Sequence, residues 1–365
     1  MLRISRSGRI LVLLLLIFIP FILAAGCGGE KILRTNIAVY KLDPAGNFMW
    51  NATFDHGMQE TGSGILEVSD GGYLIYGSES DNPKGDPGHR SYPLLIRLNS
   101  QGNIQWSRTL NQTFSPPTDY GWAAGSATES RGGNIIISTS RESNNLIQID
   151  TNGTLQWIRP VPISIRSSIR TQDGGFLFVG NGVIKTDSNG TIQWEKPIES
   201  SKNVLQTSDG RYILDHVVTD WNRSLSMTAI SCLDSDNVTI WTYEIGQTYS
   251  NDTTSLRETQ SGLVEVTLAS MRQLTFNRNG VVVAEKNITA TNPMTRTSDG
   301  GYIYGLCSAR ETLGTFPPER IPCWKSNAVY HIIRETSNGT PVWDLPSDSV
   351  SYIQQTRDGG FVLLK

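Results

Sequence analysis

The sequence is poor in the residues that most often build metal and redox centres. Its 365 residues include only four cysteines and four histidines. The histidines, His56, His89, His216 and His331, are far apart along the chain. No cysteine spacing matches a zinc site, and no Cys-x-x-Cys-His haem motif is present. We therefore expect no metal ion, no cofactor and no group of histidines at a catalytic site.

The chain also lacks a strong charge of one sign. It has 31 Lys and Arg against 34 Asp and Glu, and no dense basic stripe. This balance argues against a nucleic-acid partner. With 38 % hydrophobic residues the composition is that of a globular protein rather than a disordered one.

Residues 1–26 have the pattern of a secretory signal peptide. A basic start containing Arg3, Arg6 and Arg9 precedes an almost unbroken apolar run over residues 10–25. The 16 residues of that run fall short of the ~20 that a membrane-spanning helix needs. A cleaved signal is therefore favoured over an uncleaved anchor.

The end of this segment, Leu-Ala-Ala-Gly-Cys, resembles a bacterial lipobox. In that motif Cys27 would carry the lipid and become the mature N-terminus. The match departs at Ala24, where the family prefers Leu. Residues 27–36 would then form a short polar tether. All alternatives place the folded part outside the cytoplasm, either membrane-anchored or secreted.

Two further features are typical of exported proteins. The chain contains nine N-x-S/T sequons. The candidates for glycosylation are Asn51, Asn111, Asn222, Asn251 and Asn287. Cys307 and Cys323 bracket a segment rich in Pro and Gly, and we predict a disulfide that closes this loop, which would stabilise the fold by roughly 3 kcal/mol. Cys232 lies in an apolar run and is expected to be a buried thiol.

A turn followed by a tryptophan, D-x-x-G-x-x-x-W, occurs seven times if degenerate copies are counted. The copies are Asp43/Gly46/Trp50, Asn99/Gly102/Trp106, Asp150/Gly153/Trp157, Asp187/Gly190/Trp194, Asp234/Asn237/Trp241, Asn277/Gly280/Ala284 and Thr336/Gly339/Trp343. A second motif, T-x-D-G-G-[YF], alternates with the first and also occurs seven times. Its clearest copies begin at Thr171, Thr297 and Thr356. Such regular alternation identifies an internal repeat.

Each repeat has the pattern of four short strands joined by tight turns. In one repeat the expected strands are residues 165–171, 176–179, 183–186 and 191–194. The Asp-Gly-Gly and Asn-Gly clusters between them supply residues that accept positive φ. No stretch after residue 26 has a 3.6-residue period. Residues 37–365 therefore predict an all-β fold, a seven-bladed β-propeller of four-stranded antiparallel blades.

The two ends of the repeat region predict how the ring closes. The region begins in the middle of one repeat and stops in the middle of another. Strands from both termini are expected to pair within one blade, which leaves no exposed edge strand. The repeated tryptophans are expected to dock between blades: Trp50, Trp106, Trp157, Trp194, Trp241 and Trp343. Ala284 replaces the seventh and predicts a weaker joint.

The repeat resembles the quinoprotein-type (PQQ-like) propellers, whose blades carry an Asp, a Gly and a docking Trp around the last hairpin. Gly153 to Trp157 and Gly190 to Trp194 keep that spacing, although the step from Asp to Gly is one residue shorter. The chain is also similar to exported microbial proteins with "DGGY…KLDxxGxxxW" repeats. The resemblance implies the architecture, and it implies little about function because propellers host many activities.

The aspartates that precede Gly-Gly, among them Asp173, are interpreted as turn formers rather than as a ring of catalytic carboxylates. We therefore name no catalytic residue. Insertions between strands are where blades differ, and we expect binding there. The aromatic binding-loop candidates are Tyr92, Tyr120, Trp122, Phe316 and Trp324. The segments 79–93 and 308–326 are expected on one face of the propeller, and the segment 111–122 on the other.

These observations favour an extracytoplasmic binding or scaffold module for a protein or glycan partner. One alternative is an extracellular carbohydrate-active lyase or hydrolase that uses the central channel. Another is a subunit of a surface or envelope-assembly complex. Convergent titratable groups in the channel would favour the enzyme, and aromatic loops would favour binding.

Overall fold

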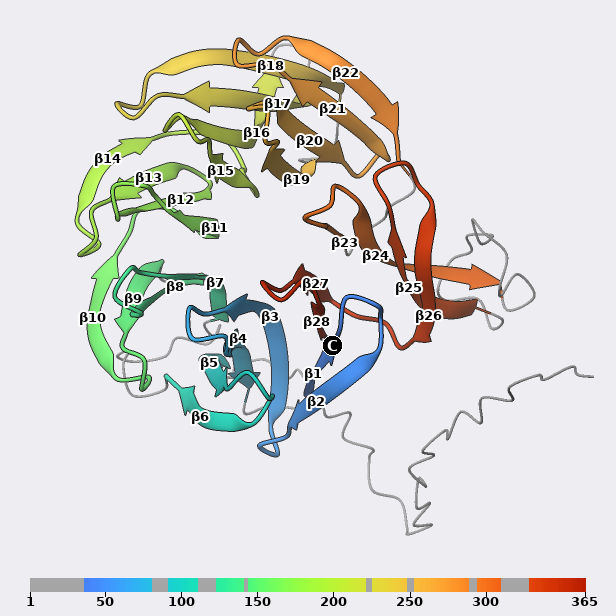
Figure 1. The fold of residues 1–365 in the computed structure, drawn as a ribbon. Coiled ribbons are helices and arrows are strands. Elements are labelled where there is room, and N and C mark those ends of the chain that lie inside the picture. The colour runs from blue at the N-terminus through green and yellow to red at the C-terminus, as the bar shows by residue number, and fades with distance from the viewer. Residues whose placement is uncertain are drawn as a thin grey trace, which may run out of the picture. The chain divides into compact units, whose positions relative to one another are not determined.

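A computed structural model of the chain describes residues 36–80, 91–110, 123–140, 144–220, 225–247, 253–288, 294–309 and 328–365. These residues form seven four-stranded antiparallel sheets, and they contain no helix. The sheets are arranged as blades around a central axis (Figure 1). The predicted seven-bladed β-propeller is therefore confirmed. It falls within the compact unit Arg34–Lys365.

The first three blades follow one another along the chain. Blade 1 contains β3 (Gln59–Glu67), β4 (Tyr73–Ser80), β5 (Ser91–Leu98) and β6 (Ile104–Thr109). Blade 2 contains β7 (Ala123–Glu129), β8 (Ile135–Ser140), β9 (Asn145–Ile149) and β10 (Leu155–Pro160). Blade 3 contains β11 (Ile165–Arg170), β12 (Phe176–Gly180), β13 (Val183–Thr186) and β14 (Ile192–Lys196).

The next three blades repeat this order. Blade 4 contains β15 (Val204–Gln206), β16 (Tyr212–Asp220), β17 (Leu225–Leu233) and β18 (Thr239–Gln247). Blade 5 contains β19 (Thr253–Glu258), β20 (Val264–Leu268), β21 (Arg272–Phe276) and β22 (Val282–Asn287). Blade 6 contains β23 (Met294–Arg296), β24 (Tyr302–Ala309), β25 (Ala328–Glu335) and β26 (Pro341–Ser347).

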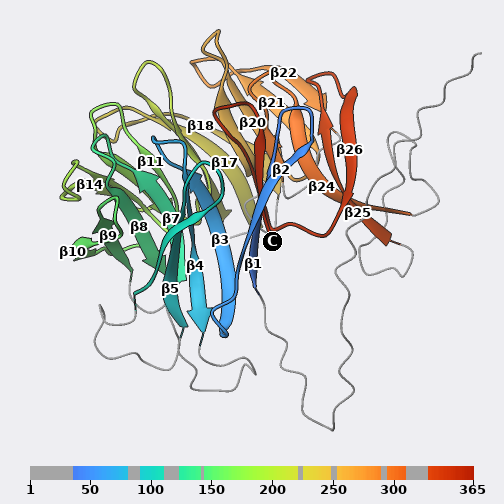
Figure 2. The same ribbon diagram turned by 60° about the horizontal axis from the view of Figure 1, so that its bottom comes forward.

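Blade 7 is built from both ends of the repeat region. Its strand order is β2 (Phe48–Phe54), β1 (Ile37–Leu42), β28 (Phe361–Leu364) and β27 (Tyr352–Gln355). Val39 of β1 pairs with Leu364 of β28. The predicted closure of the ring is confirmed, and the edges that the two ends would otherwise expose are paired (Figure 2).

Tight turns explain why each repeat folds into a hairpin. In blade 3, Gly174 N–H donates to Thr171 O at 2.9 Å, and Thr171 N–H donates to Gly175 O at 2.9 Å. Gly174 has a φ of +88°, which a residue with a Cβ adopts only at a cost. The second strand, β12, is buried along its whole length because neighbouring blades cover both of its faces.

Successive strands of a blade are antiparallel, so their connections divide between two ends of the propeller. The end that holds the first-to-second and third-to-fourth connections is called the turn face here, and the opposite end is called the loop face. Leu110 N–H donates to Pro93 O at 3.0 Å. The strand ends that flank 81–90 and 111–122 therefore lie together at the loop face. The expectation that the segment 111–122 leaves from the other face is wrong. The segment 81–90 follows the second strand of blade 1 and the segment 111–122 follows its fourth strand, and both of these strands end at the loop face.

Cys232 is a free, buried cysteine in β17, as predicted. Among the residues that the structure describes, no helix is long and apolar enough to cross a membrane.

Candidate functional site

Tryptophan rings on the outermost strands hold neighbouring blades together. Trp343 of β26 is an example, because its Nε1 donates to Pro44 O of blade 7 at 3.2 Å. A Cβ built on Gly46 would lie 2.9 Å from Cδ2 of this ring. Gly46 also has a φ of +86°, so glycine is required here both by the backbone and by the ring.

The same arrangement recurs around the ring. The Nε1 atoms of four other rings donate to the next blade: Trp50 to Ser100 O, Trp106 to Thr151 O, Trp194 to Ser235 O and Trp241 to Arg278 O, at 3.1 to 3.2 Å. Trp157 lies against Gly190. Each accepting carbonyl lies two residues before the turn glycine, or before Asn237 in blade 4. The tryptophans thus lock six of the seven blades to the turn of the next, and Ala284 of blade 5 breaks the series.

The aspartates of the T-x-D-G-G turns are neutralised within their own blades. Asp173 accepts from Lys185 Nζ at 2.7 Å and from the Thr171 hydroxyl at 2.5 Å. Burial raises the pKa of Asp173, but these hydrogen bonds and that of Gly175 N–H outweigh it and lower the pKa to about 2. The equivalent ion pairs are Asp70–Arg97, Asp299–Arg334 and Asp358–Lys41. This geometry favours turn formation over a catalytic ring of carboxylates.

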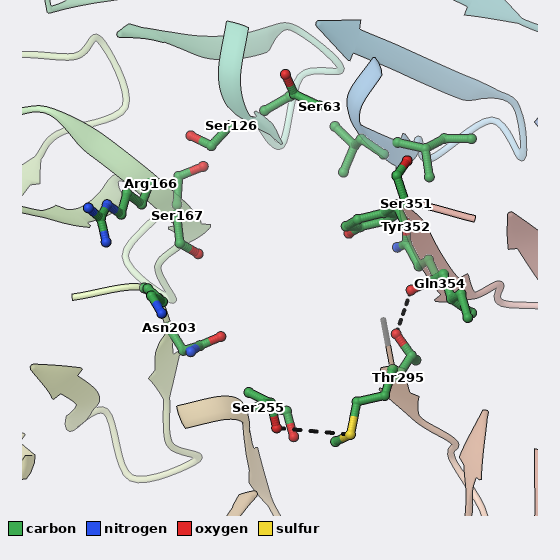
Figure 3. Close-up of a pocket in the computed structure, with 18 of the residues that line it drawn as sticks. Ser63, Ser126, Arg166, Ser167, Asn203, Ser255, Thr295, Ser351, Tyr352 and Gln354 are labelled. Carbon is green, nitrogen blue, oxygen red and sulfur yellow. Dashed lines mark hydrogen bonds between the residues drawn. The ribbon is translucent and has the colours of Figure 1, made fainter. Parts of the chain in front are cut away.

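The innermost strands of the blades surround a central channel of about 960 Å³. Hydroxyl and amide side chains of different blades line it, as Figure 3 shows: Ser63, Ser126, Ser167, Asn203, Ser255, Thr295, Ser351 and Gln354. Such a wall can donate and accept many hydrogen bonds. This channel is the candidate functional site.

Sequence reasoning missed these channel residues. A signal for part of the wall was present, because Ser167, Asn203 and Ser255 each stand four residues before the first residue of the second motif. Equal spacing from a repeated turn places such residues at one level of the ring. Small polar residues at this position were therefore the pattern to look for.

The charged residues of the channel wall are all cationic. Arg166, Lys202, Arg257 and Arg296 line the channel, and the described lining includes no Asp, Glu or His. Arg257 and Arg296 stand near the turn-face ends of β19 and β23, whereas Arg166 and Lys202 precede or begin strands at the loop face. The channel wall therefore suits ligands that are polar or anionic rather than cationic.

A Ser–His–Asp relay crosses three strands of blade 6. Ser308 Oγ lies 2.8 Å from His331 Nε2, and His331 Nδ1 lies 2.7 Å from Asp344 Oδ1. The order of contacts is that of a nucleophile, a base and an orienting carboxylate. Ser308 is 0 % and His331 is 1 % exposed. The Ser308 hydroxyl offers no surface to a substrate, so the relay serves to satisfy buried polar groups.

One group of side chains could hold a metal ion. The ligand atoms of His56, Glu60 and Glu79 lie within 4.8 Å of one another in blade 1. Each carboxylate already accepts a hydrogen bond from the protein, since Glu60 Oε1 binds His56 N–H at 2.9 Å and Glu79 binds the Thr109 hydroxyl. Nitrogen and carboxylate ligands of this kind suit a divalent transition metal.

The sequence-predicted binding and modification sites that fall within the described residues do not line the channel. Tyr92 lies half-buried in β5, paired with Glu79, rather than in a loop. Asn51 in β2 and Asn287 in β22 are exposed. Cys307 is buried in β24. Outside the described residues lie Cys27, Asn111, Tyr120, Trp122, Asn222, Asn251, Phe316, Cys323 and Trp324, so the lipid, the disulfide and these loop sites stay predictions.

No protein-family model matches the chain, and none of the curated proteins matches it either. Among solved structures the chain is similar to the Dos1 propeller, with a TM-score of 0.51, 10% identity and coverage of 89% of this chain and 81% of that one. It is equally similar to the WD40 β-propeller domain of Doa1, with a TM-score of 0.51, 11% identity and coverage of 89% and 96%.

A third similar solved structure is that of BamB from Moraxella catarrhalis, with a TM-score of 0.47, 10% identity and coverage of 84% of this chain and 99% of that one. The Dos1 and Doa1 likenesses show that the chain shares the β-propeller fold. At such low identity they show the fold alone. The narrower resemblance to PQQ-like repeats stays a prediction.

Proposed function

We propose that this chain is an extracytoplasmic binding module whose central channel takes a polar chain, and that the ligand is a glycan. The observation that carries the proposal is the channel wall itself. Hydroxyl, amide and cationic groups converge on it from all seven blades, beside apolar side chains such as Leu66, Leu256 and Ile353. Sugar hydroxyls are matched by such donors and acceptors.

Binding is favoured over hydrolysis by the titratable groups of the wall. Glycoside hydrolysis uses a pair of carboxylates on either side of the scissile bond. The described lining has no carboxylate, and the relay of Ser308 is buried away from the channel surface. The cations of the wall can still bind and orient a ligand without any proton transfer.

The N-terminal signal supports export and a lipid anchor at Cys27. If Cys27 is lipidated, the mature protein fractionates with membranes and its N-terminal peptide carries the mass of the lipid. Cys27→Ser should release the protein from the membrane fraction. An N-terminus of unmodified mass in the wild-type protein would exclude the lipid anchor and leave export by a simple signal.

The test of binding is a glycan and surface-protein array probed with the full-length protein in detergent. We expect a saturable glycan signal that Ser167→Trp abolishes, because the indole would fill part of the channel. Ser188→Trp is the matched control, since Ser188 is exposed on the turn between β13 and β14. A signal that both variants leave unchanged would place the ligand elsewhere. Binding of a protein alone would favour the envelope-assembly alternative.

A further inference from the structure

The joint between blades 5 and 6 differs from the other joints of the ring. At this joint, called the 5/6 joint below, Ala284 replaces the docking tryptophan and a Cβ on Gly339 would meet nothing within 4 Å. The buried apolar cluster here consists of blade 6 residues only: Tyr302, Tyr304, Leu306 and Ile333. Blade 5 presents polar side chains instead, among them the buried Thr267 and Gln273.

A second repeated contact joins the blades around the turn face. In the turn between the first and second strands of a blade, the backbone N–H of the second turn residue donates to a Glu or Gln side chain of the next blade. That Glu or Gln is the last residue before the equivalent turn of its own blade. Ser69 N–H donates to Glu129 at 2.8 Å, and Ser208 N–H donates to Glu258 at 2.7 Å. The other pairs are Gln172 with Gln206, Ser298 with Gln355 and Arg357 with Glu67.

At the 5/6 joint this acceptor is missing. The second turn residue of blade 5 is Gln260, and Arg296 stands where the other blades have Glu or Gln. An arginine cannot accept a hydrogen bond. No residue in the described part of the chain accepts from Gln260 N–H. The repeat thus leaves a backbone donor where five other joints hold a carboxylate or carboxamide oxygen.

Arg296 is held away from this position by blade 5. Its Nη2 lies 2.8 Å from Glu265 Oε2, and its guanidinium lies 4.8 Å from the centre of the Tyr302 ring. The Arg296 side chain is only 8% exposed. These contacts fix the guanidinium at the channel wall beside the joint, where Glu265 already compensates its charge.

Arg257 places a positive charge at the same point. Its guanidinium donates to Thr297 O and Ser298 O, each at 3.3 Å, and no described carboxylate forms an ion pair with it. A Cβ on Gly300 would lie 3.7 Å from Arg296 Nη2 and 3.9 Å from Arg257 Nη1. Both arginines line the channel. Two fixed guanidinium groups therefore flank the bare backbone of Gly300 at the turn-face mouth of the channel.

We propose that the turn-face mouth of the channel, at the 5/6 joint, binds the carboxylate of an acidic glycan. One carboxylate oxygen accepts from Gln260 N–H, as the oxygens of Glu129 and Glu258 do at their joints. Arg257 compensates its charge. The inference rests on the proposed function, which supplies the glycan, and it adds that the glycan carries a carboxylate.

The joint between blades 2 and 3 offers an internal control. Arg170 stands there at the position of Arg296, and Arg131 is the second turn residue. Arg131 donates to Gln172 O at 2.5 Å, and neither arginine is among the residues that line the channel. An arginine at this repeat position that does not line the channel is therefore not expected to bind the carboxylate.

The experiment is a calorimetric titration of the full-length protein in detergent with trigalacturonate and with its neutral methyl ester. We expect saturable binding of the acid and binding of the ester that is at least tenfold weaker. Arg257→Gln should raise the Kd for the acid about tenfold and leave that of the ester unchanged. Arg170→Gln, the matched control, should change neither value.

A backbone variant keeps the test independent of the arginines. Gln260→Pro removes the N–H donor at a turn position that suits proline, so folding is retained and the Kd for the acid should rise several-fold. Equal binding of acid and ester would overturn the carboxylate site and leave glycan binding in the channel intact. Binding of hexaglutamate but of no uronate, sensitive to Arg257→Gln, would overturn the glycan. Binding of no glycan on the array would overturn the proposed function itself.

Discussion

Lys286 Nζ donates to Ser337 O at 3.0 Å across the 5/6 joint. Ser337 lies two residues before Gly339, so its carbonyl is the one that a tryptophan Nε1 reaches at the other joints. The lysine keeps this hydrogen bond while Ala284 leaves the place of the ring open. One joint of the propeller is therefore connected by a polar contact in place of an aromatic one.

Restoring the missing ring should strengthen the propeller. In Ala284→Trp the indole would cover Gly339 and bury apolar surface, so we expect the free energy of unfolding to rise by about 1–2 kcal/mol. Denaturant unfolding measures the change. Val283→Trp is the control, because Val283 is 52% exposed on the neighbouring position. An equal gain in the control would contradict docking at this joint.

Two glycines separate the effect of the ring from that of the backbone. Gly190 has a φ of +77° and Gly339 a φ of +80°, so alanine costs about 1 kcal/mol of strain at either position. A Cβ on Gly190 would also overlap the ring of Trp157, whereas one on Gly339 meets nothing within 4 Å. Gly190→Ala should therefore destabilise by roughly 3 kcal/mol, and Gly339→Ala by about 1 kcal/mol. Equal losses would show that the tryptophan contact contributes little.

Acid should weaken the blades through the paired aspartates. The pKa of Asp173 falls from 3.8 to about 2 on folding, so its contribution to stability is present above about pH 4 and is lost as the pH falls toward 2. Asp173→Asn should remove this part of the pH dependence and leave the buried Lys185 without its anionic partner, with only Thr186 O and Gln193 Oε1 as acceptors. Unfolding curves at pH 2 to 7 for both proteins give the comparison. If the free energy of unfolding fell with pH equally in both proteins below pH 4, the Asp173–Lys185 pair would not be the source of the acid sensitivity.

The Ser308 relay gives a prediction about chemistry. Because Ser308 and His331 are buried, a fluorophosphonate probe should not label Ser308 in the folded protein. Mass spectrometry of the treated protein measures this, with Ser308→Ala as the control for background. Stoichiometric labelling of Ser308 would show an accessible nucleophile and revive the hydrolase alternative.

The fold could be predicted from sequence because its signals are local. The turn that includes Gly174 and the tryptophan four residues after Gly190 lie within a few residues of the structures that they specify. Half-repeats at the two ends also predicted the closure of blade 7. The joint at Ala284 could be singled out because one residue broke a regular pattern.

The channel was harder to predict, because only the spacing of small polar residues from the repeated turn indicates part of its wall. Ser126 and Ser255 line one channel only when the ring is closed, and both lie outside the two repeated motifs. That Arg296 replaces a hydrogen-bond acceptor can be recognised only from hydrogen bonds between blades. One of these, from Ser69 N–H to Glu129, joins residues that are 60 positions apart. Relays such as that of Ser308 and His331, 23 residues apart, depend in the same way on strand register.

The most direct test of the account is amide hydrogen exchange of the full-length protein with and without a saturating glycan ligand. The account predicts that protection is gained in the innermost strands around the channel, above all in β11 and β19, and in the turn that includes Gln260. Outer strands such as β14 and β22 should not change. Protection confined to segments at the loop face, with the innermost strands unchanged, would contradict binding in the channel.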